Sequence, residues 1–397
     1  MKVIRLREGK ERSLQRRHPW VFESSIDKGR ADPGETVRVE AHDGTFLAWG
    51  AYSPESQIRV RAWSFEAGDR IDASFFERRL TTALALRTRL GIDSDGVRLV
   101  HGEADGLPGL VVDRYADVLS AQFLAAGVER WKDVIADTLL RLSACARLYE
   151  RSDAGVRSLE GLPPVRAWLR GGSDDAAASV VTIHEGGWQL LVDVAEGHKT
   201  GYYLDQRNNR ARFASLVRQY GCRSVLNCFS YTGGFSLAAL AGGAERVVSV
   251  DSSAPALALA QRHVTLNGFD AARHEAHDAD VNTDLRERLA AGQRFDAIVL
   301  DPPKFAPTAA HADRAARAYK DINRLALKLL APGGLLLTFS CSGGINADLF
   351  HKIVAGAAMD AQVDGALIER LEAAPDHPTT LMFPEGEYLK GLVVLKA

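Results

Sequence analysis

A cysteine and an aspartate each follow directly after an apolar run in the C-terminal half of the sequence. Cys341 follows the run 334–340 and precedes a Ser-Gly-Gly segment, and Asp301 follows the run 295–300 and begins an Asp-Pro-Pro-Lys-Phe segment. The carboxyl ends of parallel strands meet at one edge of a sheet, and open α/β sheets bind their ligands at this edge. We therefore expect the two side chains to lie next to each other at a ligand site.

The types of these two residues predict methylation of a pyrimidine base. An acid followed by two prolines at a strand end is typical of methyltransferases that act on nucleobases or amides, because the rigid loop holds a flat, amine-bearing base. C5 of a pyrimidine is a poor nucleophile, so its methylation requires temporary addition of a nucleophile to C6, and a thiolate is the usual agent. We predict Cys341 as this nucleophile and Asp301 as the acid that shares a proton with N3. The other three cysteines, Cys145, Cys222 and Cys228, are interpreted as structural.

A glycine-rich turn and a second aspartate predict a nucleoside-containing cofactor. The segment 227–239 changes from strand type to helix type at Gly233, where the backbone can approach a ligand closely. Asp251 ends the next apolar run about twenty residues later, where an acid can accept hydrogen bonds from both ribose hydroxyls. These two features do not separate NAD from S-adenosylmethionine, but the Asp-Pro-Pro segment favours S-adenosylmethionine. The predicted cofactor-binding residues are Phe229, Tyr231, Gly233, Asp251, Ser252, Asp278 and Asp301. Asp278 could equally be the N-cap of a helix.

The pattern of apolar residues predicts three domains. Residues 1–70 contain short strand-type runs separated by turn signals, which indicates a small β-rich domain. Residues 71–185 mix helical periodicity with strand runs and indicate an α+β domain. In residues 186–397, apolar strand runs alternate with helical patterns, which predicts a doubly wound α/β domain with a parallel sheet covered on both faces.

Composition limits the classes of protein that the sequence can encode. The 397 residues have a formal net charge of −2, so attraction to nucleic acid must come from local basic clusters. One such cluster lies at the N-terminus and includes Arg16, Arg17 and His18. No run is long and apolar enough to span a bilayer, and the N-terminus lacks a secretory signal, so a cytoplasmic location is expected. No cysteine or histidine grouping has the spacing of a metal site.

The sequence resembles the RlmI-like family of 23S ribosomal RNA cytosine-5 methyltransferases over nearly its whole length. The resemblance rests on the segments 12–26, 197–210, 227–244, 299–306, 340–344 and 376–395. It implies an N-terminal PUA domain that binds RNA, a central α+β domain and a C-terminal Rossmann-like methyltransferase domain. It also implies that Cys341 is the nucleophile, that Asp251 holds the ribose, and that ribosomal RNA is the partner. A homodimer is compatible with the resemblance.

Several basic residues are predicted to contact RNA. Arg16, Arg17 and His18 lie where a PUA-type barrel meets phosphate groups. Arg207 and Arg210, close to Tyr202 and Tyr203, could bind phosphate beside a base that is flipped out of its stack. Lys304 takes the place of the second cysteine that many RNA cytosine-5 methyltransferases carry after the Asp-Pro motif, and it could orient the base or touch phosphate.

Three other functions are compatible with parts of the sequence. A methyltransferase that acts on a nitrogen of an RNA base would use Asp301 but would not need Cys341. An RNA-binding ribosome assembly factor without catalysis would bind RNA without turnover, which the presence of Asp251, Asp301 and Cys341 disfavours. A nicotinamide dehydrogenase is disfavoured because the sequence lacks a GxGxxG segment and has the Asp-Pro-Pro loop.

Overall fold

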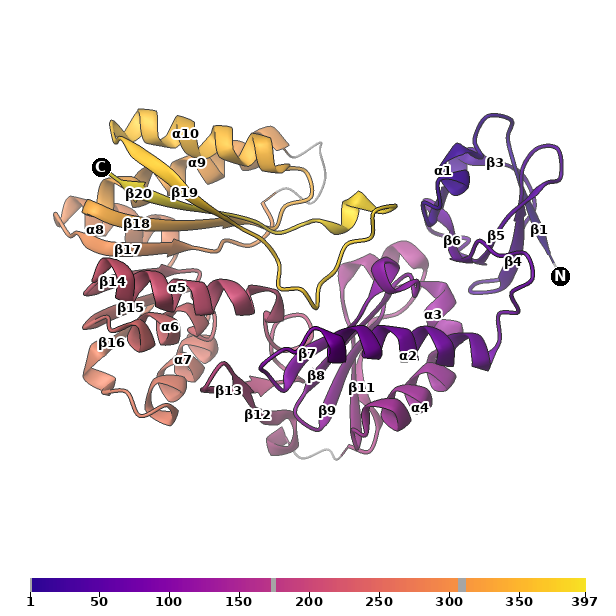
Figure 1. Ribbon diagram of the computed structural model, residues 1–397, viewed down its shortest axis with the longest axis horizontal. Helices are drawn as coiled ribbons and strands as arrows, with labels where there is room; N and C mark the ends of the chain where they lie inside the picture. The colour runs from indigo at the N-terminus through magenta and orange to yellow at the C-terminus, as the bar shows by residue number, and fades with distance from the viewer. Residues whose placement is uncertain (1, 173–175, 306–311) are drawn as a thin grey trace. The chain divides into compact units, whose positions relative to one another are not determined.

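The computed structural model describes residues 2–172, 176–305 and 312–397 (Figure 1). Contacts among these residues divide the chain into two compact units. The first unit consists of Met1–Leu204 with Pro375–Gly386, and the second consists of Asp205–Ala374 with Glu387–Ala397. None of the helices in the described part of the chain is long and apolar enough to cross a membrane.

The N-terminal part of the first unit is a six-stranded sheet with the order β2-β6-β5-β4-β1-β3. β1 pairs in parallel with β4, and the other pairs are antiparallel. Alternate residues of β4 point inward, so that Val37 and Val39 are fully buried beside Ile4 and Val60. The elements are β1 (Val3–Leu6), α1 (Arg12–Gln15), β2 (Trp20–Phe22), η1 (Glu23–Ser25), β3 (Ile26–Lys28), β4 (Thr36–Glu40), β5 (Phe46–Tyr52) and β6 (Ile58–Ser64).

A second sheet in the first unit has the order β11-β10-β9-β8-β7 and is covered by helices. The Asp72 side chain caps the first of these helices by accepting a 3.1 Å hydrogen bond from the Phe75 backbone N–H. Phe76 and Leu80 of that helix are fully buried in the core beneath it. The elements are α2 (Ala73–Arg89), β7 (Gly96–His101), η2 (Gly102–Asp105), β8 (Leu110–Tyr115), β9 (Val118–Phe123), α3 (Ala126–Arg130), α4 (Lys132–Ser143), β10 (Arg147–Ser152), η3 (Gly155–Glu160) and β11 (Val165–Arg170).

A two-stranded hairpin of β12 (Val180–Glu185) and β13 (Trp188–Asp193) follows η4 (Ala176–Ser179). Its turn consists of Gly186 and Gly187, whose φ angles are 54° and 90°. Two consecutive residues with positive φ are what a tight two-residue hairpin turn requires, and glycine adopts this conformation without steric cost. The Gly-Gly pair therefore accounts for the tight turn of this hairpin.

The second unit is built on a seven-stranded sheet with the order β16-β15-β14-β17-β18-β20-β19. The first five strands in this order are parallel, and β20 is antiparallel to both of its neighbours. A six-stranded dinucleotide-binding sheet has the order 3-2-1-4-5-6. This sheet differs because its last strand in sequence, β20, lies between β18 and β19. The elements are η5 (Leu204–Gln206), α5 (Arg207–Tyr220), β14 (Ser224–Cys228), α6 (Gly234–Gly242), β15 (Arg246–Asp251), α7 (Ala254–Leu266), η6 (Ala271–Arg273), β16 (His274–Asp278), α8 (Val281–Ala290), β17 (Phe295–Leu300), α9 (Ala312–Leu329), β18 (Leu330–Ser340), α10 (Ala347–Ala361), β19 (Gly365–Leu371) and β20 (Lys390–Lys396). The short helix η8 (Pro384–Gly386), between β19 and β20 in sequence, belongs to the first unit.

Helices cover both faces of this sheet, as its continuously apolar strands predict. On one face, Leu336 of β18 belongs to the same buried cluster as residues of α9 and α10. On the other face, Phe339 of β18 contacts Phe235 of α6, which in turn contacts Phe213 of α5. The switch in strand order lies between β14 and β17, and ligands of open α/β sheets bind at this point.

The chain enters and leaves the second unit at positions that the apolar pattern does not indicate. Residues 186–204, which we expected in the C-terminal domain, belong to the first unit. The segment Pro375–Gly386 between β19 and β20 also belongs to the first unit. There, the Phe383 ring lies 4.8 Å from the Trp20 ring, and the Asp376 carboxylate accepts a 2.9 Å hydrogen bond from the Arg98 backbone N–H.

Candidate functional site

Cys341 and Asp301 lie at adjacent strand ends of the seven-stranded sheet. β17 ends at Leu300 and pairs in parallel with β18, which ends at Ser340. The Cys341 Sγ lies 3.9 Å from the backbone oxygen of Pro302, and the Cys341 residue is partly exposed. The predicted proximity of the thiol to the Asp-Pro-Pro segment is confirmed.

A buried amide chain orients the Asp301 carboxylate. The Gln206 Nε2 donates to Asp301 Oδ2 at 3.0 Å. The Asn209 Nδ2 donates to Gln206 Oε1 at 2.6 Å and to the backbone oxygen of Glu372 at 3.0 Å. Because Gln206 Oε1 is occupied as an acceptor, its Nε2 must face the carboxylate. Sequence reasoning missed this role of Gln206 and Asn209, since neither residue has a spacing that relates it to Asp301.

Two further side chains that the sequence analysis missed fix the turn around Cys341. The hydroxyl of Tyr319, a fully buried residue of α9, lies 3.0 Å from the Oγ atoms of both Ser340 and Ser342. The Nζ of Lys390 donates to the backbone oxygen of Ser342 at 2.9 Å. Burial raises the pKa of Tyr319, which therefore remains a neutral phenol near pH 7. Only the three-dimensional pairing of β18 with β20 brings Lys390 to this turn.

The turn after β14 has the strained backbone that often marks a ligand site. Phe229, Tyr231 and Gly233 have φ angles of 58°, 47° and 74°. Left-handed conformations of bulky residues cost roughly 1–3 kcal/mol each and are concentrated at functional sites. A Cβ atom on Gly233 would lie 2.7 Å from the Cβ of Ala260, so only glycine fits there. The turn is therefore built at an energetic cost, in the place where the sequence predicts the cofactor.

The polar groups of this edge fit an adenosine-containing ligand. Asp251 ends β15, and its carboxylate accepts from the backbone N–H groups of Tyr231 at 2.8 Å and Ser253 at 3.0 Å. A carboxylate has about four acceptor positions, so sites remain for ribose hydroxyls. In the described part of the structure, the buried hydroxyls of Ser230 and Thr232 have no hydrogen-bond partner. Buried hydroxyls are normally satisfied, so these two point to a polar ligand at the turn.

The remaining predicted cofactor residues also lie at this edge. Asp278 ends β16 and is the register partner of Asp251. It is not a helix N-cap, because Asp280 caps α8 by accepting from the Thr283 backbone N–H at 3.0 Å. Ser252 directly follows β15 and is exposed.

The predicted phosphate ligands Arg207 and Arg210 are less accessible than charged side chains usually are. Both residues lie on the buried side of α5, where they are 6% and 2% exposed. Helical periodicity from the fully buried Phe213 places Arg210, three residues earlier, on the same side of the helix. Lys304, by contrast, is exposed three residues after Asp301.

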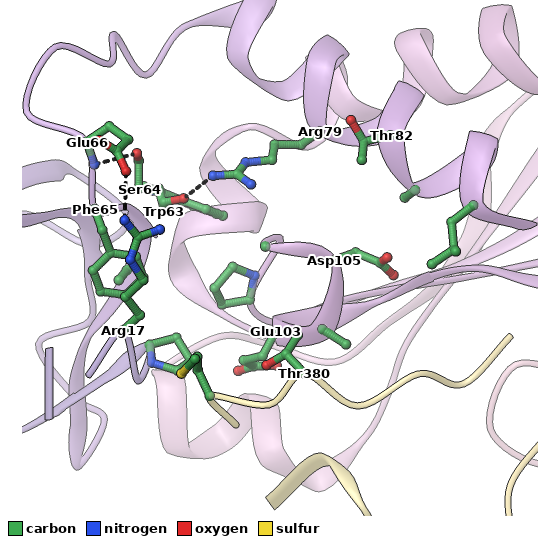
Figure 2. A pocket seen from close by; sticks show the side chains of 18 of the residues that line it. Arg17, Trp63, Ser64, Phe65, Glu66, Arg79, Thr82, Glu103, Asp105 and Thr380 are labelled. Carbon is green, nitrogen blue, oxygen red and sulfur yellow. Dashed lines mark hydrogen bonds and ion pairs between the residues drawn. The ribbon is translucent and has the colours of Figure 1, made fainter. Parts of the chain in front are cut away.

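The N-terminal basic residues border a hollow in the first unit. This pocket of about 690 Å³ is lined by residues of the six-stranded sheet, α2, η2 and the segment Pro375–Gly386 (Figure 2). Arg17 lines it and pairs with Glu66 at 3.0 Å, while Arg16 is exposed. His18 is partly buried, with Nε2 lying 3.4 Å from a carboxylate oxygen of Glu385.

A partly buried arginine reaches into this pocket from α2. Figure 2 shows the Arg79 side chain extending toward Trp63 of β6, and its guanidinium donates to the backbone oxygen of that residue at 3.2 Å. Burial lowers the pKa of Arg79, which indicates that its charge is partly desolvated. Within the described ranges, neither Arg79 nor Arg89, which also lines the pocket, has a carboxylate within ion-pair distance. A desolvated cation without a carboxylate partner favours an anionic ligand.

Comparisons with known proteins agree with the fold. Residues 165–392 match the family model of S-adenosylmethionine-dependent methyltransferases, and residues 4–65 match that of PUA-like domains. The chain is 50% identical over 396 residues to ribosomal RNA large subunit methyltransferase I of Shewanella denitrificans, covering 98% of each chain. It is 48% identical over 393 residues to the protein of the same name from Aliivibrio fischeri, again covering 98% of each chain.

Solved structures show the same overall fold at lower sequence identity. A Streptococcus mutans protein assigned as an S-adenosylmethionine-dependent methyltransferase is 21% identical and has a TM-score of 0.85 over 100% of both chains. A second structure, assigned as a methyltransferase and complexed with S-adenosylhomocysteine, is 22% identical and has a TM-score of 0.86 over 100% of both chains. The resemblance read from the sequence motifs is thus confirmed, and the chain belongs to the ribosomal RNA large subunit methyltransferase I family of S-adenosylmethionine-dependent enzymes with an N-terminal PUA-like domain.

Proposed function

We propose that this protein transfers a methyl group from S-adenosylmethionine to C5 of a cytosine in large-subunit (23S) ribosomal RNA through a covalent Cys341–C6 adduct. The observation that carries the proposal is the position of the Cys341 Sγ, 3.9 Å from the Pro302 oxygen at the strand end that bears Asp301. The names of the relatives specify large-subunit ribosomal RNA. An RNA substrate of this kind also implies the cytoplasm as the working compartment.

The turn after β14 and the ends of β15 and β16 would hold the cofactor. Asp251 would accept from the ribose hydroxyls, and Asp278 and Ser252 would lie beside the adenosine. Phe229, Tyr231 and Gly233 would shape the backbone that approaches it. When bound, S-adenosylmethionine supplies an electrophilic methyl group, which C5 of the base takes up.

Cys341 and Asp301 would perform complementary parts of the base chemistry. The Cys341 thiolate adds to C6, and the electron pair of the C5–C6 bond moves toward N3, which takes the proton that Asp301 shares with it. The Gln206 amide keeps the Asp301 carboxyl in place by donating to Oδ2. After C5 is methylated, a base removes the proton from C5, the electron pair of that C–H bond restores the C5–C6 double bond, the S–C6 bond breaks, and Cys341 leaves as a thiolate. N3 gives its proton back to Asp301 in the same step.

The first unit would bind the RNA at this pocket. Arg17, Arg79 and Arg89 bring positive charge to a lining that also holds Glu66, Glu103 and Asp105, and the exposed Arg16 directly precedes Arg17. Phosphate contacts by such residues release counterions, so affinity falls as salt rises. We expect Arg79→Met to weaken binding of ribosomal RNA and to reduce the slope of log affinity against log salt by about one, as measured by filter binding. An unchanged slope would exclude Arg79 from the interface.

Methyl transfer from labelled S-adenosylmethionine to ribosomal RNA, followed by mass spectrometry of the nucleosides, tests the reaction. We expect 5-methylcytidine with the wild-type protein and none with Cys341→Ala. A product methylated on nitrogen, or activity that survives in Cys341→Ala, would favour a methyltransferase without a covalent step. RNA binding without any methylated product would favour a ribosome assembly factor.

A further inference from the structure

We propose that Lys390 is a positioning residue for Cys341, whose ammonium group lies beside the cysteine and stabilises its thiolate. This inference rests on the proposed function, in which Cys341 is the nucleophile. It adds a residue that comes from the last strand of the chain, 49 positions after the cysteine in sequence.

The sheet register brings Lys390 to the cysteine. β20 runs antiparallel to β18, and Lys390 is the direct partner of Ser340, the residue before Cys341. Side chains of directly opposite residues in an antiparallel pair lie on the same face, with Cβ atoms about 4.5–5.5 Å apart. The Lys390 Nζ then donates to the backbone oxygen of Ser342, the residue after Cys341, at 2.9 Å. Lys390 is thus the strand partner of the residue before the thiol, and its amine bonds to the residue after the thiol.

Lys390 is buried at a place where an uncompensated charge is costly. The residue is only 8% exposed, and burial lowers the pKa of its amine. The carbonyl of Ser342 satisfies one of its three donors, but a carbonyl carries no charge to balance the ammonium. Buried lysines are rare unless they are paired with a negative charge. A thiolate at Cys341 would provide that charge.

The other ionisable groups around the thiol make a nearby cation necessary. Asp301, from the loop after β17, interacts unfavourably with negative charge at this edge, and Tyr319 from α9 is a neutral phenol. Lys304 is exposed, so solvent screens its charge. Glu387, near the start of β20, raises the pKa of Lys390, but as an acid it does not favour a thiolate. Lys390 is therefore a buried cation at the turn that holds Cys341, while Arg207 and Arg210 are buried cations on α5 of the same unit.

The coupling between the two groups must be reciprocal. The charge of Cys341 raises the pKa of Lys390, against the effect of burial. A pairwise interaction lowers the pKa of the acid by as much as it raises that of the base, because both shifts measure the same energy. Loss of the lysine charge should therefore make the thiolate harder to form. Oppositely charged groups at 4–6 Å typically change a pKa by roughly one to three units.

The rate of Cys341 alkylation by iodoacetamide as a function of pH, followed by mass spectrometry of its peptide in the full-length protein, tests the inference. We expect Lys390→Met to move the midpoint of the alkylation profile upward by roughly one to two pH units, and Lys390→Arg to restore most of the shift. The matched control is Lys396→Met. Lys396 lies at the other end of β20 and also donates to backbone oxygens, those of Leu327 at 3.0 Å and Leu330 at 2.7 Å. Its removal should leave the midpoint unchanged.

An unchanged midpoint in folded Lys390→Met would overturn the inference, even if Cys341→Ala abolishes methyl transfer and the proposed function stands. If Lys390→Met does not fold, NMR titration of lysine-labelled Cys341→Ser, with Lys390→Arg used to assign the signal, measures the reverse effect. The pKa of Lys390 should then fall relative to the wild-type protein, and an unchanged value would equally overturn the inference. If Cys341→Ala retains methyl transfer but the midpoint shifts, the proposed function fails while the pairing of Lys390 with Cys341 stands.

Discussion

Two strands of one sheet bring a cysteine to the same edge, but their surroundings differ. Cys228 ends β14 and is fully buried, and burial raises its pKa, so it remains a thiol. Cys341 follows β18, is partly exposed, and lies beside the Pro302 carbonyl and the turn that Lys390 contacts. A cysteine at a strand end is therefore not sufficient for reactivity. The polar side chains that other elements bring to that end make the difference.

The largest expected effect separates the two cysteines by their activity. Cys341→Ala should reduce 5-methylcytidine formation by at least about 10³-fold, because removal of a nucleophile removes the covalent step. Cys228→Ala removes a buried sulfur beside the cofactor turn and should retain activity within about threefold when measured at a temperature where the variant is folded. Single-turnover methyl transfer measures both rates. Equal losses in the two variants would break the comparison between the two strand ends.

The next effect tests whether Asp301 contributes proton transfer at the reactive end. Asp301→Asn keeps the size of the side chain and an acceptor oxygen but cannot exchange a proton with N3. We expect methyl transfer to slow by roughly 10²-fold, the lower part of the range for general acid–base groups. Binding of S-adenosylmethionine, measured by calorimetry, should change little, because the ribose is assigned to Asp251. A rate close to that of the wild type would show that the thiol acts without an acid partner.

A smaller effect tests the amide that holds Asp301. Gln206→Leu removes the 3.0 Å hydrogen bond to Oδ2 and should lower kcat roughly tenfold, or about 1.4 kcal/mol, which is close to the lower end of the range for a hydrogen bond to a charged group. KM for the cofactor should stay the same. Gln293→Leu is a matched control, because Gln293 also has a bonded amide, which accepts from Arg288 at 3.0 Å, but Gln293 precedes β17 and so lies at the opposite end of that strand from Asp301. Similar losses in both variants would indicate a general effect on the fold.

The sequence allowed prediction of those parts of the site that follow directly from strand ends. Asp251, Asp301 and Cys341 each end or directly follow an apolar run, so the rule that strand carboxyl ends meet at one edge was enough to place them together. Asp278 ends a polar strand and was placed only by its position where the next strand should end. Gly233 could also be recognised, since a glycine between a strand run and a helix run indicates a close turn. These predictions depend only on neighbouring residues in the chain.

Features that depend on pairing of distant segments could not be predicted. Lys390 reaches the turn after β18 only because β20 is inserted between β18 and β19 in antiparallel orientation. Gln206 reaches Asp301 across 95 positions of sequence. The burial of Arg210 was not predicted, because charged residues are usually exposed and only the position of Phe213 on α5 identifies the buried side of that helix. The segment Pro375–Gly386 was placed in the wrong unit for a related reason, since no apolar periodicity marks it.

The smallest expected effect returns to the two cysteines and concerns stability. Cys228→Ser places a hydroxyl among apolar side chains, and the charged groups near it, Asp284 and Arg288, are already bonded to each other at 2.6 Å. The free energy of unfolding should fall by about 1–3 kcal/mol, the cost of burying a polar group without a partner. Cys341→Ser should change it by less than about 0.5 kcal/mol, because the site is partly exposed and polar. Urea denaturation followed by circular dichroism measures both values. If Cys341→Ser destabilises the protein as much as Cys228→Ser does, the thiol of Cys341 contributes to packing. The surroundings of the two cysteines then differ less than the contacts around Pro302 and Lys390 indicate.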